Sequence, residues 1–437
     1  MADDPRSSIA HLFRRAGFGA TPGALDAAVV AGFEATVDTI VDLSAPDAGA
    51  TATPPPAAFV LVAPLPRTSG EEKKARNQLK RTQNETLARW WLDRMTAADR
   101  PFVEKMSLFW HGHFATGIEK VDEASYMLAQ NQIFRSRGLG TFVPLAQAVG
   151  KDPAMLVWLD ANDNKKGSPN ENFARELMEL FTIGIGSYSD TDVREAARAF
   201  TGTRVDRRSG AVSVVARHVD DSSKTILGET RAFGFDDTVA FLAGRPETAM
   251  FVSAKLWSRF AYPVATNDSA VGDLAAVFRE SGNVASVMKA LFRHPQFLST
   301  AARQGLVKQP IEWVVGALRA VGMRANEFDV VGPNLLATLR DLNQVPFNPP
   351  SVGGWPQNGY WLSTATALSR LRFANGLAGR ANLGWLNGAP AVSRPDVIAR
   401  QLGLDGWSRA TREGLNKASN PRTQLVVALT SPEYVLA

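Results

Sequence analysis

The segment "RPFVEKMSLFWHGHF", residues 100–114, combines an apolar stripe of helical spacing with two of the five histidines in the chain. Phe102, Met106 and Phe109 precede position 113 by eleven, seven and four residues. At 100° per residue these positions lie within about 40° of one line along a helix. The pattern predicts a helix whose apolar face packs in a core and ends at His113.

The two histidines of this segment point apart if the helix continues to its end. His111 then lies on the side of the helix opposite His113, so the pair can bind one ion only if the chain is extended there. Three interpretations stay open: His113 is hydrogen-bonded inside the core, His113 acts alone in a pocket, or His111 and His113 together bind a metal ion.

A second segment, "NENFARELMELF" at residues 170–181, predicts a helix with Asn170 as its N-terminal cap. Its polar residues cover about 140° of the helix surface, and apolar residues cover the rest. One interpretation is a surface helix with ion pairs four residues apart. The other is a polar cleft, whose carboxylates act as general acid and base or bind a divalent cation. The polar residues are Glu171, Asn172, Arg175, Glu176 and Glu179.

Helical periodicity dominates the rest of the chain, and we expect a mainly α, large multi-helical, bundle-like fold with one short β-hairpin near the middle. The hairpin is predicted around the turn at residues 209–210, and one helix is predicted over 236–260. The expected organisation is as follows: N-terminal helices (1–43), a Pro/Ala-rich linker or loop (44–70), a helical core with both motifs (71–202), the hairpin and a connector (203–230), and a C-terminal helical half (231–437).

Composition excludes several classes of protein. The 437 residues include no cysteine, which excludes disulfides, thiolate nucleophiles and cysteine-ligated metals. The net charge of +5 is not organised into a long basic stripe, so no nucleic-acid partner is expected. No apolar run of 18 residues predicts a membrane span, and the first residues lack the apolar core of a signal peptide. We therefore expect a cytoplasmic protein, or an exported one whose leader has been removed.

Four segments resemble the bacterial domain of unknown function 1800 family, and together they span nearly the whole chain. The resemblance implies no reaction, because that family has no assigned activity. A departure occurs at Val219, which separates His218 from Asp220 where the family pattern has His-Asp. Polar residues within such a shared motif favour a polar cleft over a plain surface helix. The segments are "HLFRRAGFGAT" (11–21), "FWHGHFATG" (109–117), "NENFARELMELFTIGIGSYSDTDVREAARAFTG" (170–202) and "PFNPPSVGGWPQNGYWLSTATALSRLRF" (346–373).

Three kinds of function follow as hypotheses. The first is an enzyme of unknown reaction, assisted by a divalent metal or another cofactor, in which Arg175 or Arg14 holds an anionic group. The second is a binding or accessory protein that recognises a partner chain or a glycan. The third is a buried ion network with a structural role. The candidate residues are Glu171, Glu176, Glu179, Arg175 and His113 for catalysis; His11, Arg14, Asn170 and Trp355 for substrate binding; and His111 and His113 for a metal.

Overall fold

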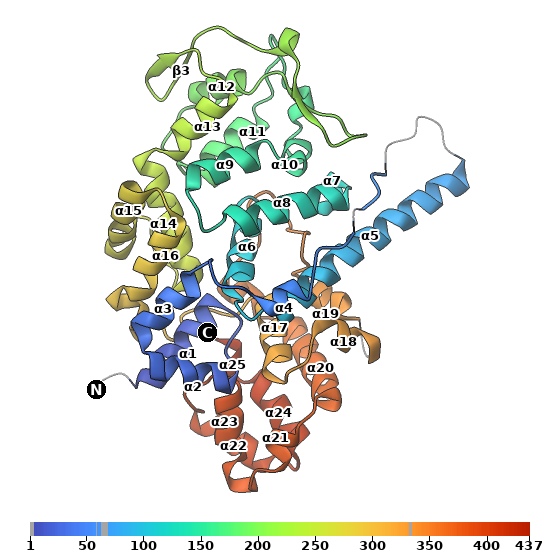
Figure 1. The fold of residues 1–437 in the computed structure, drawn as a ribbon, viewed down its shortest axis with the longest axis vertical. Coiled ribbons are helices and arrows are strands. Elements are labelled where there is room, and N and C mark those ends of the chain that lie inside the picture. Colours follow the sequence, from blue (N-terminus) through green and yellow to red (C-terminus); the bar gives the residue numbers. More distant parts are fainter. Residues whose placement is uncertain (1–3, 58, 63–68, 332–333) are drawn as a thin grey trace.

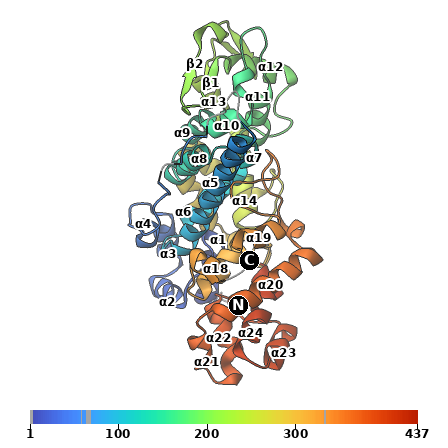
Figure 2. The same cartoon turned by 90° about the vertical axis from the view of Figure 1, so that its right-hand side faces the viewer.

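Helices make up most of the structure, as the sequence predicts. The computed structural model describes residues 4–57, 59–62, 69–331 and 334–437, and in these ranges the strands form only two short antiparallel hairpins. Figure 1 shows an elongated molecule of packed helices, and Figure 2 shows its narrower side. The mainly α prediction is confirmed. None of the helices in the described ranges has the length and apolar run that crossing a membrane requires.

The first part of the chain forms a group of short helices and one long helix that projects from the body (Figure 1). Side-chain oxygens of Asp4 and Thr21 cap the first two helices. A capping box between Ser69 and Glu72 starts the long one. These helices are α1 (Pro5–Ala16), α2 (Pro22–Ala31), α3 (Phe33–Val41), α4 (Ala48–Thr51) and α5 (Gly70–Ala97).

The described part of the Pro- and Ala-rich segment is held against α5. Arg94 Nη1 donates hydrogen bonds to the carbonyl oxygens of Ala50 and Thr53, at 2.8 and 3.0 Å. Residue 58 and residues 63–68 of the predicted linker lie outside the described ranges.

The middle of the chain contains both polar motifs. The helix predicted over 170–183 is α-helical only to Glu176 and continues as a π-helix, η2 (Leu177–Phe181), whose hydrogen bonds span five residues. The other elements here are α6 (Phe102–His113), α7 (Ile118–Val121), α8 (Ala124–Arg137), α9 (Phe142–Gly150), α10 (Pro153–Trp158), η1 (Ala161–Asp163), α11 (Asn172–Glu176) and α12 (Asp190–Ala199).

The predicted hairpin forms where the sequence places it. Strand β1 (Thr203–Val205) pairs with β2 (Val212–Val214), and Gly210 in the turn has a φ of 74°, which glycine adopts without strain. The short helix η3 (Ala216–His218) follows. A second hairpin, which was not predicted, joins β3 (Lys224–Ile226) to β4 (Glu229–Arg231) through a two-residue turn with positive φ at both positions.

The second half of the chain is helical again. The sequence predicts one helix over 236–260, but the structure has two, because Pro246 lacks a backbone N–H and starts a new helix after Gly244. The elements are α13 (Phe235–Ala243), α14 (Pro246–Phe260), α15 (Ser269–Ser281), α16 (Val284–Arg293), η4 (Pro295–Leu298), α17 (Pro310–Ala320), α18 (Ala325–Val331), α19 (Leu335–Asp341), η5 (Asn358–Trp361), α20 (Thr364–Arg380), α21 (Gly384–Asn387), η6 (Ala391–Ser393), α22 (Arg394–Gln401), α23 (Arg409–Lys417), α24 (Pro421–Thr430) and α25 (Pro432–Val435).

Helix α6 lies between two hydrophobic cores. Phe102, Met106 and Phe109 pack in one core with side chains of α14, α15 and α16. Leu108, on the opposite side of the helix, packs in the other core with side chains of α17, α20 and α24. Both faces of α6 are therefore buried, and the two histidines at its end lie inside the molecule.

Candidate functional site

His113 lies at the end of α6 and contacts the end of the π-helix η2. Its Nε2 donates a hydrogen bond to the carbonyl oxygen of Phe181 at 3.1 Å, so Nδ1 is the unprotonated nitrogen. This buried Nδ1 has no hydrogen-bond partner in the described residues. Burial and the nearby Lys255 ammonium lower the pKa of His113 to about 3. The imidazole is therefore neutral near pH 7 and offers a free acceptor.

His111 lies on the other side of α6 and fixes a different segment. Its Nε2 accepts a hydrogen bond from the backbone N–H of Phe347 at 3.1 Å. The ring packs against Phe347 and Trp355, with centroid distances of 5.3 and 5.2 Å. Burial lowers the pKa of His111 to about 3, so this ring is also neutral. One histidine thus holds η2, and the other holds the segment that follows residue 345.

Two glycines bring the histidine motif and the "GGWP" motif into contact. A Cβ atom at Gly354 would lie 2.1 Å from the carbonyl oxygen of Gly112, and Gly354 has a φ of +80°. Both conditions require glycine at position 354. The segment 353–357 consequently lies directly on α6.

A cleft of about 100 Å³ opens beside His113, between α6, α14 and the segment 353–357. Trp355 forms one wall and is only 9% exposed, so its indole is a packed wall and not an exposed rim. Of the residues predicted from sequence, His113 and Trp355 meet here. The lining consists of Leu108, Phe109, Gly112, His113, Leu180, Lys255, Arg259, Gln309, Gly353, Trp355 and Gln357.

The charge in this cleft is positive. Lys255 and Arg259 lie one turn apart on α14, and none of the described residues that line the cleft is acidic. Glu312, which does not line the cleft, balances the charge of Arg259: Arg259 Nη2 donates a hydrogen bond to Glu312 Oε1 at 2.5 Å. Lys255 makes no hydrogen bond or ion pair with any described residue; its ammonium lies 5.2 Å from the Phe251 ring. Burial lowers the pKa of Lys255.

Two of the residues that line the cleft carry a buried polar atom without a partner. The indole Nε1–H of Trp355 is buried without an acceptor, and His113 Nδ1 is buried without a donor. Leaving such a group unpaired costs about 1–3 kcal/mol. Both atoms are almost inaccessible, so a ligand hydroxyl reaches them only when a lining side chain shifts. The Lys255 ammonium is the group that an anionic ligand can pair with directly.

Glu171 and Arg175 lie on the surface of the 170–181 segment, outside this cleft. Arg175 Nη2 donates to Glu171 at 2.9 Å, and its Nη1 lies 3.3 Å from Asp190. All three side chains are substantially exposed, and ion pairs of this kind contribute little to stability. The arrangement matches the ion-paired surface helix that the spacing allows.

Glu176 and Glu179 lie further along the same segment and do not line the cleft either. Glu179 accepts a hydrogen bond from the Tyr188 hydroxyl at 2.8 Å, and burial together with this bond raises the pKa of Tyr188 to about 12. Burial and the neighbouring Glu179 raise the pKa of Glu176. His113 meets this segment at the backbone of Phe181, so the imidazole and the carboxylates are not brought together.

The remaining candidates occupy separate places. Asn170 Oδ1 accepts the backbone N–H of Asn172 at 2.9 Å, but α11 begins at Asn172 with Glu171 at the N-cap, one residue later than predicted. His11 is fully buried, bonds to the carbonyl of Phe297 at 3.1 Å, and has its pKa lowered to about 2 by burial. Arg14 lines a second, smaller cavity, which Arg259 also lines.

The described residues give no support to a metal site. Within them, no three His, Asp or Glu side chains gather in a way that could hold a metal ion. The Nε2 atoms of His111 and His113 are both hydrogen-bonded to backbone groups, on different sides of α6.

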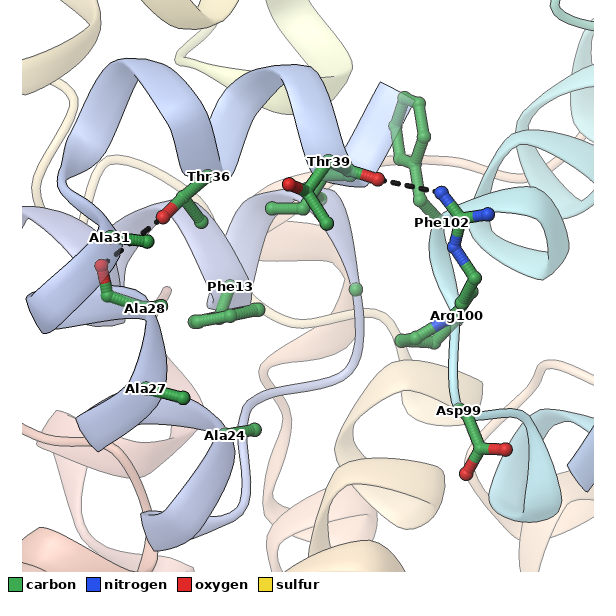
Figure 3. Close-up of a pocket in the computed structure, with 14 residues that line it drawn as sticks. Phe13, Ala24, Ala27, Ala28, Ala31, Thr36, Thr39, Asp99, Arg100 and Phe102 are labelled. Carbon is green, nitrogen blue, oxygen red and sulfur yellow. Dashed lines mark hydrogen bonds between the residues drawn. The ribbon is translucent and has the colours of Figure 1, made fainter. Parts of the chain in front are cut away.

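A larger cavity of about 290 Å³ lies between α1, α2, α3 and the start of α6 (Figure 3). Its polar groups are already paired: Thr36 Oγ1 donates to the Gly32 carbonyl at 2.7 Å, and Arg100 Nη2 donates to the Thr39 carbonyl at 2.6 Å. It therefore lacks the convergent free polar groups of the cleft beside His113. Most of its lining is apolar: Phe13, Ala16, Ala24, Ala27, Ala28, Ala31, Ile40, Pro101 and Phe102.

A comparison with known proteins assigns the chain to a family. The family model "Protein of unknown function (DUF1800)" matches residues 11–436. The chain belongs to this family. The resemblance that its motifs predict is thereby confirmed, and the whole cleft lies within the matched DUF1800 region. No curated protein and no solved structure matches the chain.

Four polar residues of the DUF1800 cleft were not predicted from sequence: Lys255, Arg259, Gln309 and Gln357. A signal for the first two exists in "FVSAKLWSRFAY", residues 251–262, where two cations four residues apart interrupt an apolar helix. The two glutamines carry no comparable signal, because their approach to the cleft depends on how distant segments pack.

Proposed function

We propose that this DUF1800 protein binds a small anionic ligand that also carries hydroxyl groups, such as an acidic sugar, in the cleft beside His113. The observation that carries the proposal is the unpaired Lys255 ammonium in a cleft whose described lining has no acidic side chain. Arg259, one turn away, is ion-paired with Glu312 but adds planar N–H donors suited to a carboxylate or sulfate.

The neutral groups of the cleft support a hydroxylated ligand. When a lining side chain shifts on binding, the buried His113 Nδ1 can accept a hydrogen bond from a hydroxyl, and the buried Trp355 Nε1–H can donate one to it. The Gln357 side chain lies exposed at the mouth, where an amide can bond to further hydroxyls.

Binding has more support than acid–base catalysis. Glu171, Glu176 and Glu179 contribute nothing to the lining of the cleft, so no carboxylate pair among the described residues lies beside a bound ligand. A small ligand is also favoured over a partner chain, because the cleft encloses only about 100 Å³.

Calorimetric titration tests this proposal at constant ionic strength, with a hexuronic acid and the matching neutral hexose as probes. We expect the hexuronic acid to bind and the neutral hexose to bind much more weakly. Lys255→Met removes a charged hydrogen bond worth about 1.5–3 kcal/mol and should weaken binding by about 10- to 100-fold. Lys417→Met, the same change at an exposed lysine outside the cleft, is the matched control and should bind like the wild type.

Trp355→Phe keeps most of the aromatic wall but removes the indole donor, so we expect a smaller loss of affinity than for Lys255→Met. Equal affinity of the wild type and Lys255→Met for the hexuronic acid would contradict the proposal. Failure of every hydroxylated anion to bind would do the same.

A further inference from the structure

A second cavity lies on the far side of Arg259, where α1, α6, α14, α17 and residues 306–308 meet. It encloses about 20 Å³. Five cationic side chains and a single carboxylate side chain line it within the described residues. The lining is Arg14, Arg15, Gly17, Phe18, Lys105, Arg259, Leu306, Val307, Lys308, Glu312 and Ala437.

Glu312 is the counter-charge of two of the five cationic side chains. It forms ion pairs with both Lys105 and Arg259. Its other oxygen accepts the backbone N–H of Gln309 at 3.0 Å. Its direct contacts are thus with groups other than Arg14, Arg15 and Lys308.

The arginines of α1 are held mainly by backbone carbonyls. Arg14 Nη1 donates to the Gly403 carbonyl, and its Nη2 lies 3.8 Å from the partly exposed Asp405. Arg15 Nη2 donates to the Ala302 carbonyl. A carbonyl satisfies a donor but does not neutralise the guanidinium charge.

Lys308 is the group with least compensation. Its side chain makes no hydrogen bond or ion pair with any described residue, although it is only 9% exposed. The ammonium lies 3.6 Å from the centre of the Tyr434 ring, a cation–π contact, and the Glu312 carboxylate acts on it from a distance without forming an ion pair. Arg15 Nε is likewise buried without a partner. A buried cation in this setting requires an anion or loses its proton.

We infer that this cavity binds one monatomic anion of about the size of a water molecule, such as chloride, between Lys308 and Arg15. A cavity needs about 10–15 Å³ of volume to hold one water molecule. The volume here is about 20 Å³, so the cavity holds one small ion and excludes phosphate or sulfate. The inference does not rest on the ligand proposed for the cleft beside His113 (the outer cleft), since the two sites share only Arg259.

Thermal unfolding tests the inference in sodium chloride and in sodium isethionate at equal ionic strength. We expect the Tm of the wild type to rise with chloride and to level off, with a total rise of about 1–3 °C. Lys308→Met should lose this rise, because methionine fills the space without a charge. Lys255→Met and Lys417→Met should keep it, which separates this site from the outer cleft and from surface charge.

Crystals soaked in sodium bromide locate the anion by anomalous scattering. A bromide peak beside Lys308 Nζ, absent from crystals of Lys308→Met or, if that variant does not fold, Lys308→Gln, supports the inference. An identical Tm in chloride and isethionate overturns it, as does a chloride response in Lys308→Met equal to that of the wild type. A larger rise with phosphate than with chloride overturns the assigned size.

Discussion

At Gly354 the backbone approaches α6 so closely that no side chain fits. An alanine there would place its Cβ against the Gly112 carbonyl and would hold a positive φ that L residues avoid. We predict that Gly354→Ala lowers the free energy of unfolding by about 2–4 kcal/mol, measured by denaturant titration.

Gly353→Ala is the matched control for this change. A Cβ at Gly353 meets only Ser351 Oγ, at 3.6 Å, which is an ordinary contact. Equal stability of the two alanine variants would mean that the segment moves away from α6 at little cost.

At the scale of single residues, spacing placed His113 on the buried stripe and His111 on the opposite side of the helix, and both placements hold in α6. Spacing did not show which group His113 contacts. The π-helix η2 brings the Phe181 carbonyl to His113, while the carboxylates of the 170–181 segment lie elsewhere. Nothing in the composition of "LMELF" distinguishes a π-turn from an α-turn.

Among the elements, α5, α6 and α8 are joined by one carboxylate. Glu104 is 1% exposed and accepts hydrogen bonds from Arg94 Nε at 2.7 Å and from Arg135 Nε at 2.8 Å. Its second oxygen accepts the Trp91 indole N–H at 2.9 Å. We predict that Glu104→Gln destabilises the protein by about 3–5 kcal/mol, because two partly buried guanidinium groups lose their buried counter-charge.

Denaturant unfolding of Glu104→Gln checks this prediction, with Glu280→Gln as the control. Glu280 is exposed, so the same chemical change there should shift stability by less than about 0.5 kcal/mol. A loss for Glu104→Gln no larger than this would show that the three helices are held by their apolar contacts alone.

Element type was largely predictable, because periodicity and caps are local properties. Proline and glycine at element boundaries and the turn at Gly210 gave most helix starts and the first hairpin. The second hairpin was missed because its turn is Leu227–Gly228, and leucine is an unusual residue at a positive φ. Strand β3 packs on α12, and the backbone N–H of Leu227 donates to Asp192 Oδ1 of α12 at 2.6 Å, so contacts outside the turn support it.

Across the whole molecule, Glu312 links the two cores by pairing α17 with α14 and α6. Burial alone would raise its pKa, but Arg259 and Lys105 outweigh burial and lower the pKa from 4.5 to about 2. The stabilisation is therefore fully present above about pH 4.5 and is lost as the pH falls toward 2. Glu312→Gln cannot titrate and lacks this component.

We predict that the wild type exceeds Glu312→Gln in unfolding free energy at pH 6, and that the difference shrinks by about 2 kcal/mol between pH 6 and pH 3. Denaturant titrations of both proteins at each pH, at a fixed chloride concentration, measure this difference in unfolding free energy. A difference that stays constant with pH would mean that Glu312 is not a titrating link between the cores.

The arrangement of the whole could not be read from the sequence. Lys255, Lys308 and Arg14 lie far apart in the sequence, and only Lys255 stands in an apolar local context that sets it apart from an ordinary solvated cation. Their burial around two cavities follows from long-range packing, which hydrophobic periodicity does not encode. The shared family motifs marked α6, α11 and the 346–373 segment as special but did not say which of them meet.

Three polar side chains of α1 bond to segments that are made much later during synthesis. The apolar face of the helix packs on the neighbouring α2, but His11 bonds to Phe297, Arg15 to Ala302 and Arg14 to Gly403. At 5–20 residues per second the wait for the last of these partners is roughly 20–80 s. We therefore expect these three side chains to be hydrated on the nascent chain and to lose that water only when the C-terminal half arrives.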